Sequence, residues 1–178
     1  NFTFRQAFDV AASRYVKLSD ETMRDLDIGP DGKWAVGRDM RGYLDDKKRP
    51  AADFYRVNTS TGERTLMMKG QLVGGHTDGI SPHGTHFLYW KDNRYHAYDL
   101  NAGTSKALGN GTSVNFMDTE DDHPGVRGSF GIAGYSSDGK SVIAQHKYDL
   151  WQVPLDGSAA QDDDAVVVLN DQHHFYAH

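Results

Sequence analysis

The chain has 178 residues, of which 38% are hydrophobic and 25% charged, enough for a domain with a buried core. Its net charge of −6 and scattered lysines and arginines argue against a nucleic-acid partner, and no apolar run approaches the ~20 residues of a membrane helix. The sequence has no cysteine, which excludes disulfides, thiolate catalysis and cysteine-type zinc sites, and nothing in it indicates a cofactor.

The N-terminal segment, residues 1–23, carries the strongest helix signal of the chain. Its apolar residues recur at Phe4, Ala7, Phe8, Ala11 and Ala12, a spacing that predicts one short helix between residues 4 and 16. A basic cluster at residues 47–49 follows two aspartates, and we interpret it as a solvated turn.

An internal repeat follows, with equivalent turn glycines at Gly32, Gly84 and Gly139. Each glycine ends a turn phrase, and a strand-like run and a second glycine turn come after it. The three turn phrases are Ile28-Gly29-Pro30-Asp31-Gly32, Ile80-Ser81-Pro82-His83-Gly84 and Tyr135-Ser136-Ser137-Asp138-Gly139. Repeats of about 50 residues made of short strands are typical of β-propeller blades. We therefore predict an all-β, propeller-type fold of about three blades, each a four-stranded antiparallel meander.

The strand-like runs are apolar on both faces, as expected for blades packed between neighbours. In residues 85–90, Phe87 and Tyr89 alternate with Leu88 and Trp90. The tryptophans of the three repeats, Trp34, Trp90 and Trp151, are interpreted as core residues; a sugar-stacking platform is the alternative.

Residues 24–160 resemble the propeller of secreted S9-type serine peptidases, the prolyl oligopeptidase and dipeptidyl-peptidase-like enzymes, with blades of the TolB-like type. The third repeat carries most of the resemblance, through the ordered segments 116–124, 130–135 and 148–151. In that family the propeller is not catalytic: it covers the active site of a separate hydrolase domain and filters substrates by size. The resemblance also implies a periplasmic or secreted location and structural roles for Asp121, His123, Asp149 and Trp151.

No part of the sequence matches the hydrolase domain of that family or provides a catalytic triad. The nearest approach to a nucleophile elbow is Gly128-Ser129-Phe130-Gly131, which has Arg127 where the first glycine of the motif belongs. We therefore expect no catalytic residue here. We expect an enzymatic function only if the chain is part of a longer peptidase or acts together with another chain.

Two clusters are weak candidates for metal binding. His173, His174 and His178 lie together near the C-terminus, where helical spacing would place two imidazoles side by side, although a polar tail is the simpler interpretation. Asp118, Glu120 and Asp121 form a carboxylate loop that could hold Ca²⁺ but lacks the glycine and final glutamate of an EF-hand, so a solvated loop is the simpler interpretation.

The expected organisation is an N-terminal segment, three blades and a divergent tail with one strand, at residues 1–23, 24–70, 71–110, 111–160 and 161–178. The resemblance ends near residue 160, so either the chain is a fragment or the tail replaces a missing blade. The function we expect is that of a non-catalytic, substrate-gating propeller portion. The alternative is a stand-alone module that binds a protein, a peptide or a small ligand. Because three blades leave two open edges, we expect a homo-oligomer, such as a dimer closing a six-blade ring, or further domains of a longer chain.

Overall fold

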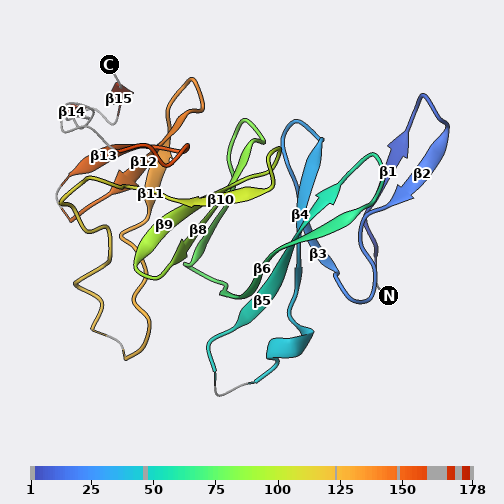
Figure 1. The fold of residues 1–178 in the computed structure, drawn as a ribbon, viewed down its shortest axis with the longest axis horizontal. Coiled ribbons are helices and arrows are strands. Elements are labelled where there is room, and N and C mark those ends of the chain that lie inside the picture. The colour runs from blue at the N-terminus through green and yellow to red at the C-terminus, as the bar shows by residue number, and fades with distance from the viewer. Residues whose placement is uncertain are drawn as a thin grey trace. The chain divides into compact units, whose positions relative to one another are not determined.

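The computed structural model describes residues 3–45, 48–122, 124–147 and 149–159, and the backbone of 168–170 and 174–176 (Figure 1). The described residues contain no α-helix, only strands and the 3-10 turn η1 (Arg41–Tyr43). No helix of the described residues is long and apolar enough to cross a membrane.

Three sheets carry the repeats, and in each the strands lie in chain order. The first sheet is β3 (Asp25–Ile28), β4 (Trp34–Asp39), β5 (Ala51–Asn58) and β6 (Arg64–Leu72). The second is β7 (Thr77–Ile80), β8 (His86–Lys91), β9 (Arg94–Asp99) and β10 (Thr104–Ala107). The third is β11 (Ile132–Tyr135), β12 (Ser141–Gln145) and β13 (Leu150–Pro154). Two four-stranded meanders and a three-stranded one are blades of the propeller type, so the predicted all-β fold is confirmed.

The three repeats share one set of backbone hydrogen bonds around the turn that joins their first two strands. The amide of each turn glycine donates to the carbonyl three residues earlier: Gly32 to Gly29 at 2.9 Å, Gly84 to Ser81 at 2.8 Å and Gly139 to Ser136 at 2.9 Å. All three glycines have φ near +70°, a left-handed conformation that glycine adopts without steric cost. A second bond ties the end of the third strand to the residue after the glycine: Thr59 to Lys33, Leu100 to Thr85 and Leu155 to Lys140. The sequence repeat is therefore a structural repeat.

The helix expected between residues 4 and 16 is wrong, because this segment forms a hairpin of β1 (Gln6–Asp9) and β2 (Arg14–Lys17). Its turn is stabilised locally: the Asp9 Oδ1 atom accepts from the Ala12 amide at 3.0 Å, and Ser13 has a φ of +49°. The Phe8 and Tyr15 rings lie opposite each other with centroids 4.9 Å apart. Cross-strand aromatic pairing and the turn therefore prevail over an apolar spacing that also fits a helix.

The described residues divide into two compact units with separate cores. The first unit comprises 1–74, 80–87 and 99–103, and the second 75–79, 88–98 and 104–178. The first core packs Val16, Leu18, Met23, Leu26, Ala35 and Val57. The second is built on Trp90 and Tyr95, with Leu88, Ala97, Leu108, Phe116, Val142, Ala144, Val153 and Leu155. As predicted, Phe87, Leu88, Tyr89 and Trp90 are all buried.

Beyond the third sheet, the described part of the tail pairs β14 (Val168–Asn170) with β15 (His174–Tyr176), two short strands where the sequence indicated one. The blade boundaries at 70, 110 and 160 stay a prediction.

Candidate functional site

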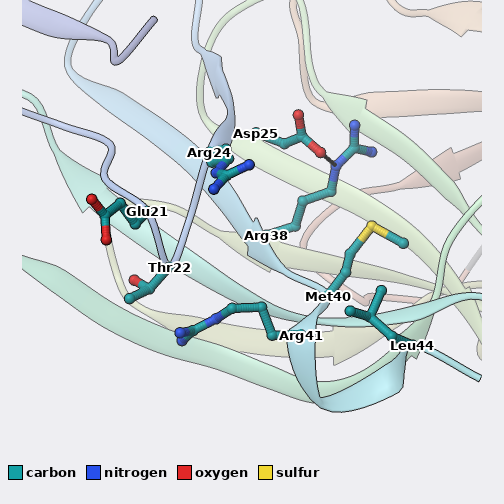
Figure 2. A pocket seen from close by; sticks show the side chains of 8 residues that line it. All are labelled: Glu21, Thr22, Arg24, Asp25, Arg38, Met40, Arg41 and Leu44. Atoms are coloured by element: carbon teal, nitrogen blue, oxygen red, sulfur yellow. Dashed lines mark hydrogen bonds and ion pairs between the residues drawn. The ribbon is translucent and has the colours of Figure 1, made fainter. Parts of the chain in front are cut away.

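A pocket of about 260 Å³ opens beside the first sheet, within the first unit (Figure 2). It lies between the segment that leads into β3, the end of β4 and the turn η1, so three consecutive parts of one blade form it. Its lining residues are Glu21, Thr22, Arg24, Asp25, Arg38, Met40, Arg41 and Leu44.

Carboxylates hold two of the three arginines of this pocket in place, Arg38 and Arg41. The Arg38 Nε atom lies 3.3 Å from Asp25 Oδ2, across the antiparallel pair that β3 and β4 form (Figure 2). Arg41 donates two hydrogen bonds to the Asp39 carboxylate, from Nε to Oδ1 at 2.9 Å and from Nη2 to Oδ2 at 2.7 Å. These bonds lower the pKa of the Asp39 carboxyl, which stays charged and anchors the guanidinium.

Asp20 fixes the segment that leads into the pocket. Its Oδ1 atom accepts from the Thr22 hydroxyl at 2.6 Å and from the Thr22 amide at 2.8 Å, and Oδ2 lies 3.0 Å from Arg64 Nη1. These contacts, led by the Thr22 hydroxyl, lower the pKa of Asp20 to about 2. The tight turn at residues 20–23 therefore sets where Glu21 and Arg24 stand at the pocket rim.

The pocket combines three guanidinium groups with an apolar wall. Guanidinium groups recognise carboxylates and phosphates through planar, paired donors. Met40 and Leu44 supply the apolar surface, and the Leu44 side chain is 77% exposed. Because two acidic side chains also line it, the pocket suits a single acidic group with an apolar neighbour better than a polyanion.

A second group of polar residues lies in the second unit, around Asp78 on β7. Asp78 retains an exposed surface, yet the protein around it raises the pKa of its carboxyl to about 6, mainly through desolvation. His76 acts in the opposite direction and favours the charged carboxylate. Burial, helped by the charge of Asp78, raises the pKa of the Tyr95 and Tyr135 phenols. Perturbed groups of this kind gather at functional sites more often than elsewhere.

The structure gives the residues of the acidic loop local partners. The Asp118 Oδ1 atom accepts from the amides of Glu120 at 2.9 Å and Asp121 at 3.2 Å, so it caps a turn. Glu120 lies 2.7 Å from Lys147 Nζ. In the part of the chain that the structure describes, no three His, Cys, Asp or Glu side chains gather as they would around a metal ion.

The remaining predicted residues fall partly outside the described chain. His123, His173 and His178 lie outside the described residues, and for His174 the structure describes the backbone alone. Asp149 accepts a backbone bond from the His146 amide at 2.8 Å, just before β13. Trp151 pairs with Ala144 across β12 and β13 and packs on the second core. Their structural roles, and metal binding by either cluster, stay predictions.

Ser129, the nearest approach to a nucleophile elbow, lies in an isolated bridge opposite Met117. Its hydroxyl oxygen accepts from the Gly131 amide at 3.2 Å. This position is not the turn between a strand and a helix on which hydrolase nucleophiles stand.

Sequence reasoning missed both polar sites. The pocket arginines are spread over 18 residues and share no motif, so the pairing of β3 with β4 and the turn η1 are needed to bring them together. Asp78 takes the position that Leu26 takes in the first repeat, counted back from the turn glycine, but Asp78 and the equivalent Ala133 of the third repeat are both exposed, so the repeat does not single this position out.

Comparison with known proteins adds little to this picture. No family model matches the sequence, and no curated protein matches it. Among solved structures, the chain is similar to a protein from Agrobacterium tumefaciens provisionally assigned as TolB, with 19% identity and a TM-score of 0.47. The match covers 84% of this chain and 50% of the other, so the chain spans about half the length of that structure. The propeller-type fold assignment rests on the sheets themselves.

Proposed function

We propose that the chain is the non-catalytic, peptide-contacting portion of a β-propeller, of the kind that gates substrates for S9-type serine peptidases. The arginine-lined pocket beside β3 is the observation that carries this proposal, because it offers paired donors to a carboxylate and an apolar surface to the adjoining residue. The ordered segments of the third repeat support the link to S9 peptidases, and with it a periplasmic or secreted location.

The proposed ligand is a peptide with one acidic side chain or a terminal carboxylate next to an apolar residue. Arg41 is the best placed donor, since Asp39 holds its guanidinium from one side while the group stays exposed. Preorganisation of this kind lowers the entropy cost of binding.

A stand-alone binding module is the second candidate, and the same pocket supports it equally. The peptidase portion and the stand-alone module differ in whether a hydrolase domain accompanies the propeller. Intact-mass measurement of the native gene product reveals a hydrolase domain for a peptidase portion and none for a stand-alone module.

Binding is tested by fluorescence anisotropy with two labelled peptides that differ only in Glu against Gln beside a leucine. We expect the Glu peptide to bind several-fold more tightly, and Arg41→Gln to remove that preference. Arg94→Gln is the matched control, because Arg94 lies in the second unit and bonds to Asn110. Equal affinity for both peptides in the unaltered chain would contradict peptide recognition at this pocket.

Catalysis is tested separately with a chromogenic dipeptide. We expect no turnover by this chain. Turnover that a serine-directed inhibitor abolishes would overturn the non-catalytic assignment without bearing on the pocket.

A further inference from the structure

The N-terminal hairpin has one covered edge and one open edge. Its second strand, β2, lies against the turn between β5 and β6, where the Arg14 Nη2 atom donates to the Ser60 carbonyl oxygen at 3.1 Å. A Cβ atom added to Gly62 in that turn would lie 2.7 Å from the Lys17 carbonyl oxygen. All four residues of β1, by contrast, line a pocket of about 340 Å³, so open space reaches this strand along its length.

The hydrogen-bond pattern of the hairpin shows which residues of β1 present backbone groups at the open edge. The Leu18 amide donates to the Arg5 carbonyl oxygen at 3.1 Å, so the backbone of Arg5 faces the β2 side. Alternate residues of an antiparallel strand point toward and away from the partner strand, so Gln6 and Phe8 direct their amides and carbonyls outward. Among the described residues, neither has a backbone partner on that side. An edge of this kind is a template for a further strand.

Self-pairing of β1 about a two-fold axis is limited to registers that place outward-pointing residues opposite each other. One such register sets Gln6 opposite Phe8 of a second copy, with Ala7 on the axis. It also sets Arg5 opposite Asp9 of the second copy, twice by symmetry. The neighbouring allowed registers, shifted in either direction, separate these two charges. Charge complementarity therefore selects a single register.

Both side chains are available for these ion pairs. Arg5 is exposed, and within the described part of the chain its guanidinium has no hydrogen bond or ion pair. The Asp9 Oδ2 atom lies 4.0 Å from Arg14 Nε, a loose contact, while Oδ1 accepts from the Ala12 amide. Opposite charges directly across a strand pair stabilise it, and like charges destabilise it.

Pairing also covers apolar surface that the hairpin leaves exposed. Phe8 is 51% exposed and Tyr15 is 73% exposed, and their rings lie side by side on the outer face of the hairpin. In the selected register the Phe8 rings of the two copies are diagonal neighbours, a separation that aromatic side chains can bridge. Ala7, on the axis, is small enough for the close approach of a non-hydrogen-bonded pair.

We propose that β1 is the interaction surface for a second copy of this chain. The two hairpins form one four-stranded antiparallel sheet, β2–β1–β1–β2, across a two-fold axis. Gln6 and Phe8 exchange backbone hydrogen bonds at both ends of the interface, and Arg5 pairs with Asp9 at both ends. This surface differs from the arginine-lined pocket and from the outer edges of the blades, so the dimer does not depend on closing a propeller ring.

Sedimentation equilibrium of the full chain across micromolar concentrations tests the surface. We expect a monomer–dimer equilibrium in the unaltered chain and a monomer in Gln6→Pro. Proline removes one outward amide and leaves the ladder with β2 intact, because the Gln6 amide does not face β2. An unaltered chain that stays monomeric overturns the proposal. A Gln6→Pro variant that dimerises with unchanged affinity and unchanged circular dichroism also overturns it, and would place the interface at the blade edges.

Charge reversal tests the register. Arg5→Glu and Asp9→Arg should each weaken the dimer by about tenfold or more, since each variant sets like charges opposite each other. An equimolar mixture of the two should recover the affinity, because both opposing pairs are complementary in the mixed dimer. Lys140→Glu, an exposed charge reversal in the second unit, is the control and should change nothing. A mixture that associates no better than the separate variants would contradict the Arg5–Asp9 pairing.

A cross-link gives a second test that does not depend on the charges. The chain has no cysteine, so Ala7→Cys introduces a single thiol on the proposed axis. Oxidised glutathione should convert this variant to a disulfide-linked dimer, because cross-strand neighbours lie within the Cα separation that a disulfide spans. Ala11→Cys, at the exposed hairpin turn, is the matched control and should stay monomeric under the same oxidation. Equal cross-linking of the two variants would contradict the proposed axis.

Discussion

The Arg56 guanidinium lies 4.5 Å from the centre of the Trp34 ring and donates from Nη1 to the Leu100 carbonyl oxygen at 2.8 Å. Trp34 in turn donates from its indole nitrogen to the Asn101 side chain at 3.0 Å. Trp34 is half-buried rather than part of a blade core. Together with the Arg56 guanidinium over its ring, it links the 99–103 turn to the first sheet.

Replacing Arg56 with methionine should destabilise the first unit. The change keeps much of the apolar stem but removes the cation over the ring and the charged hydrogen bond, contributions that together amount to about 1–3 kcal/mol. Urea unfolding followed by tryptophan fluorescence measures the loss. Arg94→Met is the control, since Arg94 bonds to a single exposed amide. Equal stability of the two variants would show that the stacked arrangement contributes little.

Asp20 should make the stability of the chain depend on acid pH. Its pKa falls from 3.8 to about 2 on folding, so the carboxylate contributes stability above pH 4 that is lost as the pH falls through 2. Asp20→Asn should therefore cost about 1 kcal/mol at pH 7, after allowance for solvent screening, and the difference from the unaltered chain should shrink between pH 4 and pH 2. Chemical unfolding at a series of pH values measures this. A difference that stays constant down to pH 2 would contradict it, and Asp27→Asn is the exposed control.

The turn glycine of the second repeat should not tolerate a side chain. Gly84 has a φ of +70°, and a Cβ atom added there would lie 2.7 Å from the Asp31 carboxylate. Gly84→Ala should lower the free energy of unfolding by about 1–2 kcal/mol. Gly42→Ala is the matched control, because nothing lies within 4 Å of its added Cβ and its φ is not left-handed. Similar melting temperatures for the two variants would contradict the predicted strain.

Open blade edges should drive self-association. Propellers close with four to eight blades, and a sheet edge without a neighbour exposes unpaired backbone groups. We therefore expect a dimer in light scattering at micromolar concentration. A stable monomer under those conditions would mean that the edges are covered within the chain itself.

The sequence predicts the repeated parts of this fold well. It predicts poorly the parts whose structure depends on tertiary contacts. Turn chemistry and strand alternation recur in each repeat, so the spacing of Gly32, Gly84 and Gly139 is enough to identify three equivalent turns. The hairpin at residues 6–17 was not predicted, because its apolar spacing fits a helix as well as a paired strand. Local propensity does not distinguish the two when the decisive contact is cross-strand, as between Phe8 and Tyr15.

The candidate sites depend on contacts that no local pattern encodes. Arg38 reaches Asp25 through strand register, and Arg41 reaches the pocket through the η1 turn after β4. The raised pKa of Asp78 likewise depends on the tertiary surroundings of β7, which the local sequence does not encode.

A double-mutant cycle between Arg41 and the acidic residue of the peptide tests the proposed peptide contact most directly. Affinities are measured for the unaltered chain and Arg41→Gln, each against the Glu and the Gln peptide. If the guanidinium contacts the carboxylate, the two changes are not additive, and the coupling free energy is about 1 kcal/mol or more. If the effects of Arg41→Gln and of the Glu-to-Gln change in the peptide add within about 0.3 kcal/mol, the guanidinium does not bind the acidic group. That result would contradict the proposed function.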